Sequence, residues 1–376
     1  MKIAIVTPGG VDESATERVI PAFLWLIERL ARRHDVHVFA LSQEPRPRDW
    51  SLLGATVHNV GTVGARRLRF HRLFAREHRV APFDVVHALF GGSALHAISA
   101  GKRFRLPVLT HLTGGELVRL PEIGYGAQLS RRGRIRTRLI AAGSTRITVG
   151  TPHMQRLAAS LGIDAGLVPL GVALDRWPLC PPRTRDASRP ARLLHVADLR
   201  PVKDQPMLLA AAALVRGRGI PFELHMAGFD TTNGGTQRSA AAQELSDVVH
   251  WHGLLAREPL RLLVLESDLL VHTSRHEAGP MAVLEAALAG VPTVGTDVGH
   301  VNEWAPDAAV AVSVGDAGAL ADAIIALLVD EPRRLAIARE AQKRAIAIDA
   351  DYTVASFERL YAESLAASGR RAAPTT

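Results

Sequence analysis

The chain has 376 residues, of which 47% are hydrophobic and 22% are charged. This composition excludes a disordered chain, and the length suits two α/β domains of ordinary size. The single cysteine, Cys180, excludes an intramolecular disulfide and favours a reducing, cytoplasmic setting. No apolar run approaches the ~18 residues that a membrane span needs, and the run at residues 1–8 is too short for a secretory signal.

The formal net charge is +8, and most of the excess is arginine. The arginines crowd two segments, at Arg66, Arg67, Arg69, Arg72, Arg76 and Arg79, and at Arg131, Arg132, Arg134, Arg136 and Arg138. Solvated helix faces explain such runs most simply, and the alternative is a basic surface for anionic lipid or an anionic acceptor. Nucleic acid is not expected, because aromatic residues make up only 5% and do not interleave with the arginines.

Short β-rich apolar runs alternate with helical patterns along the whole chain. The predicted strands are 3–8, 35–41, 56–60, 84–89, 107–112, 146–150 and 166–170, followed by 192–197, 223–228, 248–253, 269–274, 293–296 and 310–314. Predicted helices between them include 19–33, 208–217 and 281–289. This alternation indicates parallel sheets covered on both faces, and two complete series indicate two Rossmann-like domains.

A proline-rich segment, residues 176–190, separates the two series. It has little apolar periodicity and therefore predicts a linker. We place the first domain at 1–178, the linker at 179–191 and the second domain at 192–350. A further helical pattern occupies about 352–366.

The segment Ser274–Gly290 (SRHEAGPMAVLEAALAG) carries two glutamates, Glu277 and Glu285, eight positions apart. A strand ends near Ser274, and Pro280 suits the first position of a helix that Gly290 ends. The N–H groups at 279–281 would attract a diphosphate, with Glu285 placed for ribose hydroxyls and Glu277 for an attached sugar. Taken alone, this spacing fits a solvated surface helix better than a binding site.

The longer string resembles the hallmark of the retaining family-4 glycosyltransferases of the GT-B fold, roughly S-x-x-E-G-F-G-x-x-x-L-E-A-x-A-x-G-x-P-V-V-x-x-D-x-G-G. The matching positions are Glu277, Leu284, Glu285, Ala286, Gly290, Pro292, Asp297 and Gly299. The departures are Ala278, Gly279 and Pro280 in the elbow, and His300 in place of the last glycine.

A second match is ADLRPVKD at residues 197–204, where the family has G-R-L-x-P-x-K-G. Lys203 stands at the family lysine that neutralises the donor diphosphate, a task suited to a mobile ammonium. Asp198 replaces the family arginine, and Arg200 is the obvious substitute. The plainer alternative is a solvated lysine in a first helical turn.

Two glycines, Gly9 and Gly10, follow the first predicted strand directly. Their backbone N–H groups can approach a ligand closely, although a tight strand-to-helix turn needs glycine as well. The resemblance implies contact with the donor phosphates or the acceptor. The NAD fingerprint GxGxxG and the P-loop GxxxxGK[ST] do not occur.

A histidine normally precedes Gly-x-Asp/Glu in the family and touches the transferring sugar. Thr113 holds that place here, and His111 lies two residues earlier on the same strand face. The loop 120–126 is expected to line the acceptor cleft. The predicted residues of the sugar and acceptor cleft are His87, His111, Thr113, Gly114, Gly115 and Glu116.

The resemblance covers about residues 1–366. It implies an α/β protein with two Rossmann-like domains facing across a cleft, and a C-terminal helix, about 352–366, that packs back on the first domain. The implied reaction transfers a sugar from a nucleotide-sugar donor to an unidentified acceptor hydroxyl (glycan, lipid or small molecule) with retention of configuration. Glu277 and Lys203 would be catalytic. The donor would be bound by Glu285, Arg200, Gly279, Pro280, Met281, Gly9, Gly10 and Gly299.

No cofactor and no metal are expected. HExxH and Cys/His spacings do not occur, and Asp349-Ala350-Asp351 lacks the preceding strand of a metal-binding D-x-D. The predicted setting is cytoplasmic, with peripheral contact to an anionic inner membrane face as an option. The alternatives are a sugar phosphorylase, a nucleotide-sugar epimerase and a catalytically silent nucleotide-sugar-binding protein.

Overall fold

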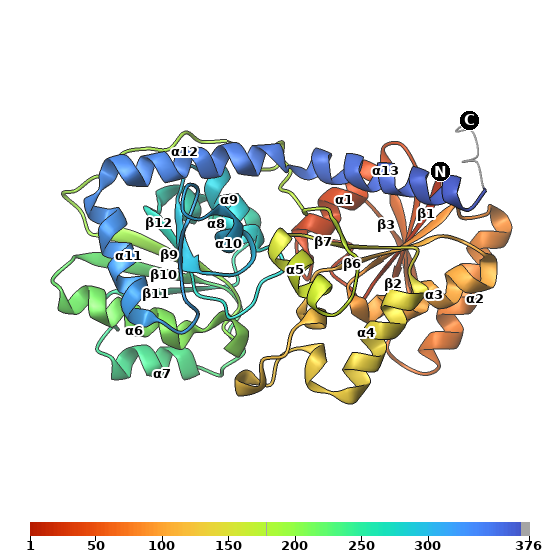
Figure 1. Cartoon of the computed structure of the whole chain (residues 1–376), viewed down its shortest axis with the longest axis horizontal. Helices are drawn as coiled ribbons and strands as arrows, with labels where there is room; N and C mark the ends of the chain where they lie inside the picture. Colours follow the sequence, from red (N-terminus) through yellow and green to blue (C-terminus); the bar gives the residue numbers. More distant parts are fainter. Residues whose placement is uncertain (178, 370–376) are drawn as a thin grey trace. The chain divides into compact units, whose positions relative to one another are not determined.

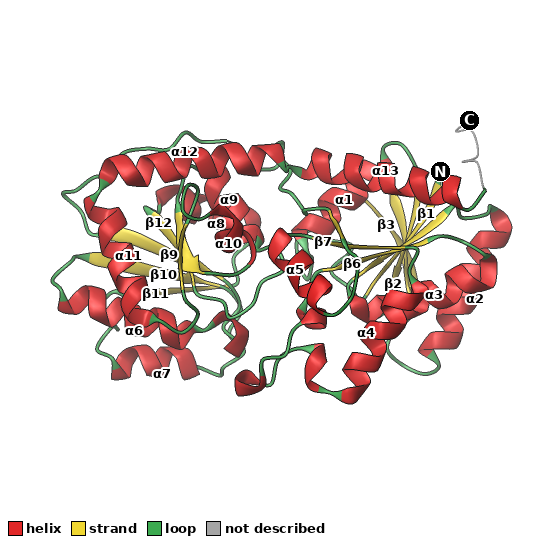
Figure 2. Ribbon diagram, in the orientation of Figure 1, coloured by secondary structure: helices red, strands yellow, loops and turns green. Residues whose placement is uncertain are grey.

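The computed structural model describes residues 1–177 and 179–369, and the chain divides into two compact units. Unit 1 comprises Met1–Gly171 and the residues from Ala350 onward, and unit 2 comprises Val172–Asp349. Each unit is a largely parallel sheet flanked by helices (Figures 1 and 2). The predicted fold class, two Rossmann-like α/β domains, is confirmed. The predicted linker, residues 179–191, lies within unit 2.

The sheet of unit 1 has the order β3-β4-β2-β1-β5-β6-β7-β8, and only the β3–β4 pair is antiparallel. The strands are β1 (Lys2–Thr7), β2 (Asp35–Ala40), β3 (Arg48–Leu52), β4 (Ala55–Asn59), β5 (Val85–Leu89), β6 (Val108–Leu112), β7 (Arg146–Val149) and β8 (Gly166–Leu167). Sequence patterns missed β3, an edge strand in which only Trp50 and Leu52 are buried. It turns into β4 through Leu53 and Gly54, both at positive φ, as a tight hairpin requires.

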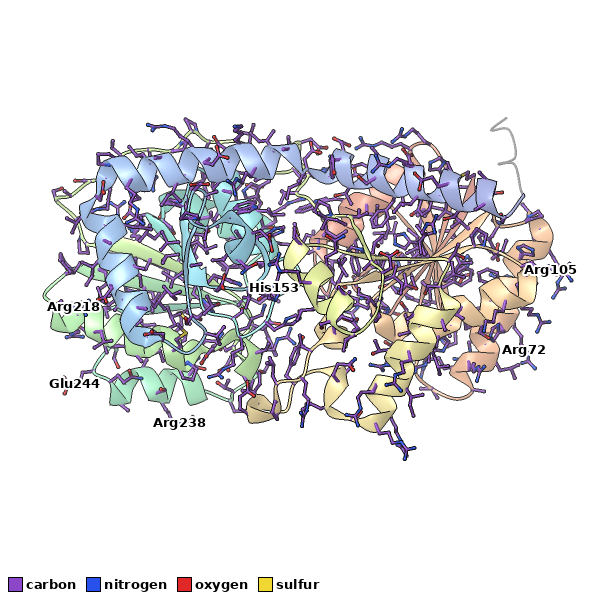
Figure 3. All side chains as sticks on the ribbon, in the orientation of Figure 1. Arg72, Arg105, His153, Arg218, Arg238 and Glu244 are labelled. Carbon is purple, nitrogen blue, oxygen red and sulfur yellow. The ribbon has the colours of Figure 1, made fainter. Side chains whose placement is uncertain are left out.

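The helices of unit 1 are α1 (Pro21–Ala31), α2 (Arg66–Val80), α3 (Gly91–Phe104), α4 (Arg131–Gly143), α5 (Pro152–Ser160) and α13 (Ala350–Ala367). Short 3-10 turns at Gly115–Leu117, Pro121–Ile123 and Ala127–Leu129 lie between β6 and α4. The arginine-rich pattern of α2 is a solvent-facing one: its buried residues are Phe70, Phe74 and Ala75, while Arg72 projects outward (Figure 3).

The C-terminal helix α13 is part of the core of unit 1. Its residues Val354, Phe357 and Tyr361 join the apolar cluster built by β1, β2, β5 and α1. Two polar contacts fix it further: the Arg29 Nε donates to Asp351 Oδ1 at 2.7 Å, and the Tyr361 hydroxyl lies 2.7 Å from His87 Nδ1. A segment from the far end of the chain thus completes the packing of this unit.

The sheet of unit 2 is parallel throughout, with the order β11-β10-β9-β12-β13-β14. The strands are β9 (Ala191–Val196), β10 (Phe222–Ala227), β11 (Val249–Gly253), β12 (Leu269–His272), β13 (Thr293–Thr296) and β14 (Val310–Val312). The helices are α6 (Gln205–Gly217), α7 (Gly235–Ala242), α8 (Arg257–Glu266), α9 (Met281–Leu288), α10 (Gly299–Trp304), α11 (Ala317–Val329) and α12 (Glu331–Ala347). The central strands are apolar on both faces, as parallel strands covered by helices must be.

Both units place their first strand in the middle of the sheet and reverse the direction of strand addition beside it. In unit 1 the reversal falls between β1 and β5, and in unit 2 between β9 and β12. The loops that leave the carboxyl ends of two such strands diverge and open a crevice where ligands bind in open α/β sheets. The topology therefore points to the loops after β9 and β12, and after β1 and β5.

The Tyr361–His87 contact gives a test of how α13 stabilises unit 1. Tyr361→Phe should lower the free energy of unfolding by about 1–3 kcal/mol, because it leaves the buried His87 Nδ1 without its partner. Denaturant unfolding measures the change. Tyr352→Phe on the same helix is the control, since Tyr352 is nearly half exposed and should change stability little. Equal effects of the two substitutions would contradict this role of Tyr361.

Candidate active site

The loops after β9 and β12 are joined at the topological switch point of unit 2. The first contains the 3-10 turn Pro201–Lys203, and the second contains Glu277. Thr273 Oγ1 donates to the Lys203 carbonyl at 2.9 Å, and the Arg275 N–H donates to the Val202 carbonyl at 2.8 Å. These bonds hold the two loops together as one surface.

Lys203 and Glu277 form an ion pair within that surface. The Lys203 Nζ lies 2.5 Å from Glu277 Oε1, and the side chains are 19% and 11% exposed. Ser274 Oγ donates to the same oxygen at 2.6 Å, and His272 Nε2 lies 3.3 Å from it. The two residues that sequence motifs marked as catalytic are thus in direct contact. Ser274 and His272 were missed, although they precede Glu277 by three and five positions.

The charge state of Glu277 follows from this contact. Burial by itself would raise the pKa of Glu277, but the Lys203 ammonium and the contact with His272 outweigh it and hold the pKa below the usual range. The carboxylate is therefore negative at neutral pH. The site contains a fixed negative group and a partly exposed cation.

His195 belongs to a hydrogen-bond network at the base of the two loops. It lies on β9, fully buried, and burial lowers its pKa to about 4, so that the ring is neutral. The ring sits 2.9 Å from the Val271 carbonyl of β12 through Nδ1, and Nε2 is 3.2 Å from the Gln205 amide. Gln205 also donates to the Asp198 carbonyl at 3.1 Å. This network ties the strand ends to the start of α6, and sequence motifs gave no sign of it.

Helix α9 begins at Met281, with Pro280 as its N-cap residue rather than its first helical residue. No side chain caps this end, and the Val283 N–H donates to the Pro280 carbonyl at 3.2 Å, so the first N–H groups of the helix, before Val283, are the ones suited to an anion. Gly299 lies against the same elbow at a φ of +54°. A Cβ there would stand 2.9 Å from both Glu277 Cβ and Pro280 Cδ, so the position requires glycine.

Glu285 lies in the second turn of α9 and is 7% exposed. Its backbone carbonyl accepts a hydrogen bond from Trp177 Nε1 at 2.9 Å. Within residues 1–177 and 179–369, no hydrogen bond or ion pair reaches its carboxylate. Burial without a partner raises the pKa of Glu285 to about 7. The two glutamates of one motif therefore differ sharply in charge state.

Arg200 and Asp198 contact each other on the loop after β9. The Arg200 guanidinium donates to Asp198 Oδ2 at 3.2 Å, and both side chains are well exposed, at 51% and 39%. Arg200, which we expect to bind the donor, is thus paired in this structure with Asp198, the residue that replaces the family arginine. The pair is solvent-screened and weak enough for an anionic ligand to displace it.

In unit 1 a side chain of the same unit binds the backbone N–H groups of the loop after β1. The N–H groups of Gly10 and Val11 donate to Gln43 Oε1 at 2.7 and 3.0 Å. Gly10 has a φ of +83° and makes the turn possible. In this structure the Gly10 N–H is thus bound by Gln43, and contact of Gly9 and Gly10 with a ligand stays a prediction.

The structure places His87 and His111 in the core of unit 1 rather than at a cleft surface. Both are fully buried; His87 contacts Tyr361 and Phe357 of α13, and His111 Nδ1 lies 2.9 Å from Thr148 Oγ1. Burial lowers the pKa of each to about 3, so both rings are neutral. The sequence pattern could not show that α13 covers these two strands.

Glu116 organises the loop after β6. Its two carboxylate oxygens accept hydrogen bonds from the N–H groups of Gly91, at 2.7 Å, and Gly114, at 2.8 Å, and so cap the first turn of α3. Thr113 directly precedes Gly114, and its Oγ1 is buried without a hydrogen bond. Glu116 thus shapes the loop with its carboxylate already occupied.

A pocket of about 400 Å³ lies beside this loop in unit 1. It is lined by Pro8, Phe90, Gly92, Gly114, Gly115, Glu116, Tyr125, Gly126, Ala127 and Arg136. Gly114, Gly115 and Glu116 were singled out by sequence motif, and Tyr125 and Gly126 belong to the loop expected at the acceptor cleft. Phe90 and Arg136 were missed; Arg136 is exposed, like the other members of its arginine run.

Comparison with known proteins agrees with this geometry. Residues 182–344 match the family described as Glycosyl transferases group 1, and residues 19–170 match the Glycosyl transferase 4-like domain. A glycogen synthase of Mycobacterium tuberculosis is 26% identical over 69% of this chain and 64% of its own length, so the chain matches less than two thirds of that relative.

Two solved structures share the fold over nearly the whole chain. Sucrose-phosphate synthase of Thermosynechococcus elongatus superposes with a TM-score of 0.82 at 16% identity, covering 98% of this chain and 100% of that one. HepE of Anabaena, solved with UDP-glucose, superposes with a TM-score of 0.75 at 18% identity, covering 98% and 100%. Both superpositions show that the chain has the two-domain GT-B fold.

Family matches in both units agree with that class, and the chain belongs to the GT-B glycosyltransferases. The described part of the chain contains no helix with the length and apolar character of a membrane span.

The strength of the Lys203–Glu277 pair can be measured by a double-mutant cycle with Lys203→Met and Glu277→Gln. We expect a coupling energy of about 1–3 kcal/mol in the free energy of unfolding, because the pair is largely shielded from water. The Lys343–Glu340 pair on α12, whose lysine is 79% exposed, is the control and should show no measurable coupling. Equal coupling in the two cycles would contradict a strong pair.

Proposed function

We propose that the protein transfers a glycosyl group from a nucleotide-sugar to an acceptor hydroxyl, with retention of the anomeric configuration. One observation carries the proposal: the Lys203–Glu277 pair lies at the switch point of unit 2, on the loop that leads into the uncapped start of α9. A diphosphate sugar has the charge and length to use each of these groups. The conserved fold of HepE, which was solved with UDP-glucose, supports the same donor class.

The donor would be bound by three features of unit 2. The N–H groups at the start of α9 and the Lys203 ammonium supply positive charge for the diphosphate. Glu285 lies four residues into α9, and its free carboxylate would accept hydrogen bonds from the two ribose hydroxyls. These groups supply positive charge and hydrogen bonds to the donor, and we propose that transfer uses no cofactor and no metal ion at this site.

In the reaction, the bond between the anomeric carbon and the diphosphate oxygen breaks, and the electron pair leaves with the diphosphate. Lys203 would stabilise the charge that develops on this leaving group. The acceptor hydroxyl forms the new bond on the same face of the sugar, and its proton passes to the departing phosphate oxygen. Glu277, held negative and oriented by Ser274, would position the sugar and stabilise positive charge near the anomeric carbon.

The acceptor would enter the pocket of unit 1. Its walls combine the aromatic rings of Phe90 and Tyr125 with backbone from Gly114 and Gly115 and one cation, Arg136. Ring faces and polar backbone suit a hydroxyl-bearing acceptor, and the lining contains one carboxylate, Glu116, beside the one cation.

We also propose peripheral contact with an anionic membrane on the cytoplasmic face, through α4. Ile135 and Leu139 lie one helical turn apart and are 46% and 54% exposed, although apolar. The exposed arginines around them are Arg131, Arg132 and Arg138. Apolar side chains surrounded by arginine are typical of helices that lie in the headgroup region of a bilayer.

The donor-site assignment predicts distinct kinetic effects of three substitutions. Lys203→Ala and Glu277→Ala should lower kcat about 10²- to 10³-fold, because both act on charge that develops during transfer. Glu285→Ala should instead weaken nucleotide binding. Transfer from UDP- and GDP-sugars and nucleotide Kd values measure these changes. Glu258→Ala, in the exposed first turn of α8, is the control.

A near-wild-type kcat in Lys203→Ala and Glu277→Ala, together with an unchanged nucleotide Kd in Glu285→Ala, would contradict the assignment. Release of sugar phosphate on addition of inorganic phosphate would indicate a phosphorylase instead. Nucleotide binding without turnover of any donor would indicate a silent binding protein.

Nucleotide affinity should depend on pH through Glu285. Its pKa of about 7 means that the carboxylate is mostly protonated one pH unit below neutrality and mostly ionised one unit above it. Ribose hydroxyls donate to the ionised form, so affinity should rise between about pH 6 and 8, by up to tenfold for each unit by which binding lowers this pKa. Calorimetry at several pH values measures the trend. Glu285→Gln keeps the titration of the nucleotide phosphate and removes the titration of residue 285. If the pH dependence of nucleotide affinity is the same in Glu285→Gln as in the wild type, the role of Glu285 is contradicted.

Membrane contact through α4 can be tested by flotation with vesicles that contain anionic lipid. Binding should be strong at low salt and weaken as salt is added, because charge attraction is screened. The pair Ile135→Ser and Leu139→Ser should reduce flotation and leave nucleotide binding unchanged. Failure of the wild type to float at low salt would remove the proposal.

A further inference from the structure

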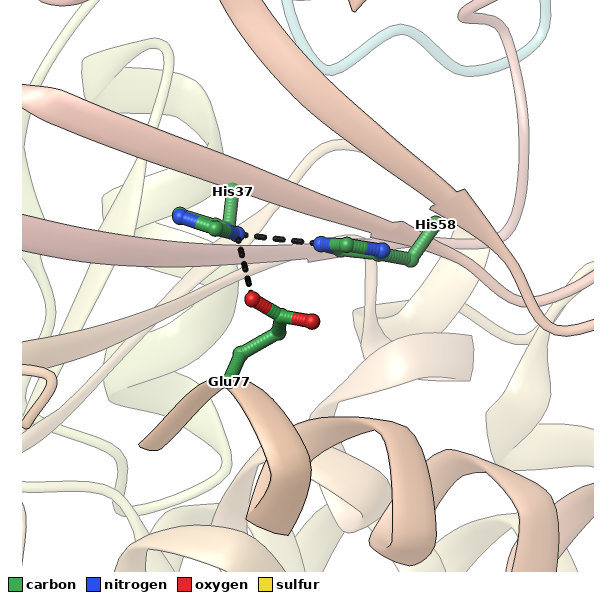
Figure 4. A group of neighbouring side chains, drawn as sticks. All are labelled: His37, His58 and Glu77. Carbon is green, nitrogen blue, oxygen red and sulfur yellow. Dashed lines mark hydrogen bonds and ion pairs between the residues drawn. The ribbon is translucent and has the colours of Figure 1, made fainter. Parts of the chain in front are cut away.

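Three potential metal ligands meet at one edge of the unit 1 sheet. His37 lies on β2, His58 on β4 and Glu77 on α2, and Figure 4 shows their side chains pointing toward one another. His37 Nδ1 lies 3.0 Å from His58 Nε2 and 3.8 Å from Glu77 Oε2. One ligand atom from each residue falls within 4.8 Å of the others. We refer to these three residues as the His37 cluster.

The nitrogen of each ring that points away from the cluster faces a carboxylate. His37 Nε2 lies 3.2 Å from Asp35 Oδ1, and His58 Nδ1 lies 3.2 Å from Asp49 Oδ1. Histidines that bind metals regularly donate their second N–H to a carboxylate, which fixes the tautomer and directs the other nitrogen to the ion. Both rings of the cluster already have this partner.

Counting protons shows why a cation suits the cluster. Two neutral imidazole rings carry two N–H protons between them. Three close contacts compete for them: the inner one between the rings and the outer ones to Asp35 and Asp49. If both protons lie on the outer nitrogens, the two inner nitrogens face each other as lone pairs. If one proton lies between the rings, one outer nitrogen has no proton to donate to the carboxylate that it faces. His58 Nδ1 is indeed a buried atom without a well-formed hydrogen bond.

A metal ion at the inner position resolves this conflict. It accepts the two inner lone pairs, and both protons then lie on the outer nitrogens, where Asp35 and Asp49 accept them. The total number of protons does not change. Tetrahedral zinc at about 2.0–2.1 Å from its ligands holds them roughly 3.3 Å apart, close to the observed 3.0 Å between His37 Nδ1 and His58 Nε2.

The surroundings hold the ligands in place. His37 and His58 are 8% and 2% exposed, and the rings of Phe83 and Phe39 pack against them at centroid distances of 5.4 and 5.0 Å. Glu77 Oε1 is bound by Arg76 Nε at 2.7 Å, which leaves Oε2 for the ion.

The local charges can also accommodate a divalent cation. Three carboxylates, those of Asp35, Asp49 and Glu77, lie around the cluster, together with two cations, those of Lys2 and Arg76. The metal-free cluster with neutral rings is therefore short of positive charge by one.

We propose that His37, His58 and Glu77 bind a zinc ion that joins β2, β4 and α2 of unit 1. Two imidazoles and one carboxylate suit zinc, with water in the fourth position, whereas magnesium and calcium prefer oxygen ligands alone. The role is structural: the ion would link the sheet edge to a helix that is otherwise attached by few buried residues. The three ligands are far apart in the chain, so no short-range spacing could have revealed them.

Metal content of the full-length protein, expressed without a histidine tag, tests the proposal. After dialysis against a weak chelator, we expect about one zinc ion per chain in the wild type and much less in His58→Gln and in Glu77→Gln. The more exposed trio Glu223, His225 and His250 of unit 2 supplies the matched control: His250→Ala should retain the ion. Asp49→Asn should weaken zinc affinity about 10- to 100-fold through its contact with His58.

Cobalt provides a second measurement that does not depend on zinc retention. The cobalt-loaded wild type and His250→Ala should show the visible absorption of a tetrahedral nitrogen and oxygen site, and Glu77→Gln should lose it. Thermal stabilisation by a nucleotide checks that each variant remains folded. A wild type that holds no zinc and shows no such cobalt spectrum, or a Glu77→Gln variant that holds as much metal as the wild type, would overturn the proposal.

Discussion

The ion pair between Lys203 and Glu277 is the interaction on which the unit 2 site depends. The strand order brings β9 and β12 side by side, and the loops that leave them meet because each carries one half of the pair. A carboxylate as buried as Glu277 stays ionised only beside a cation and good hydrogen-bond donors, here Lys203 and Ser274. The Thr273 bond to the Lys203 carbonyl and the neutral His195 beneath it then hold both loops in register.

Glu277 and Glu285 come from one motif but are placed in opposite electrostatic environments. The first has a cation and the second has none, and burial therefore raises the pKa of Glu285 while that of Glu277 is held low. Within residues 1–177 and 179–369 the Glu285 carboxylate has no hydrogen-bond partner, and the start of α9 is likewise without a side-chain cap. Both features are costly in an isolated protein; under the proposed function, ribose hydroxyls would relieve the first and a diphosphate the second.

Unit 1 has the same topology, but side chains of the unit already bind backbone N–H groups at its strand ends. Gln43 occupies the N–H groups after β1, and Glu116 caps α3, so the pocket beside them is bounded by backbone that is already ordered. The far end of the chain, α13, buries His87 and His111. In the His37 cluster, by contrast, the two histidine rings face each other and each ring also faces a carboxylate.

The alternation of strand and helix, the glycine stop at Gly290 and the spacing of Glu277 and Glu285 could be read from the sequence alone. Each depends on periodicity or backbone freedom within a few residues, and these patterns sufficed for two α/β domains and for the motif that carries the site. Only the tertiary structure decided which side chains became partners. Lys203 meets Glu277 across 74 positions, and α13 covers His111 from the end of the chain, because long-range packing sets burial and charge environment. For the same reason, two histidines and a glutamate from β2, β4 and α2 became neighbours without any mark in the local sequence.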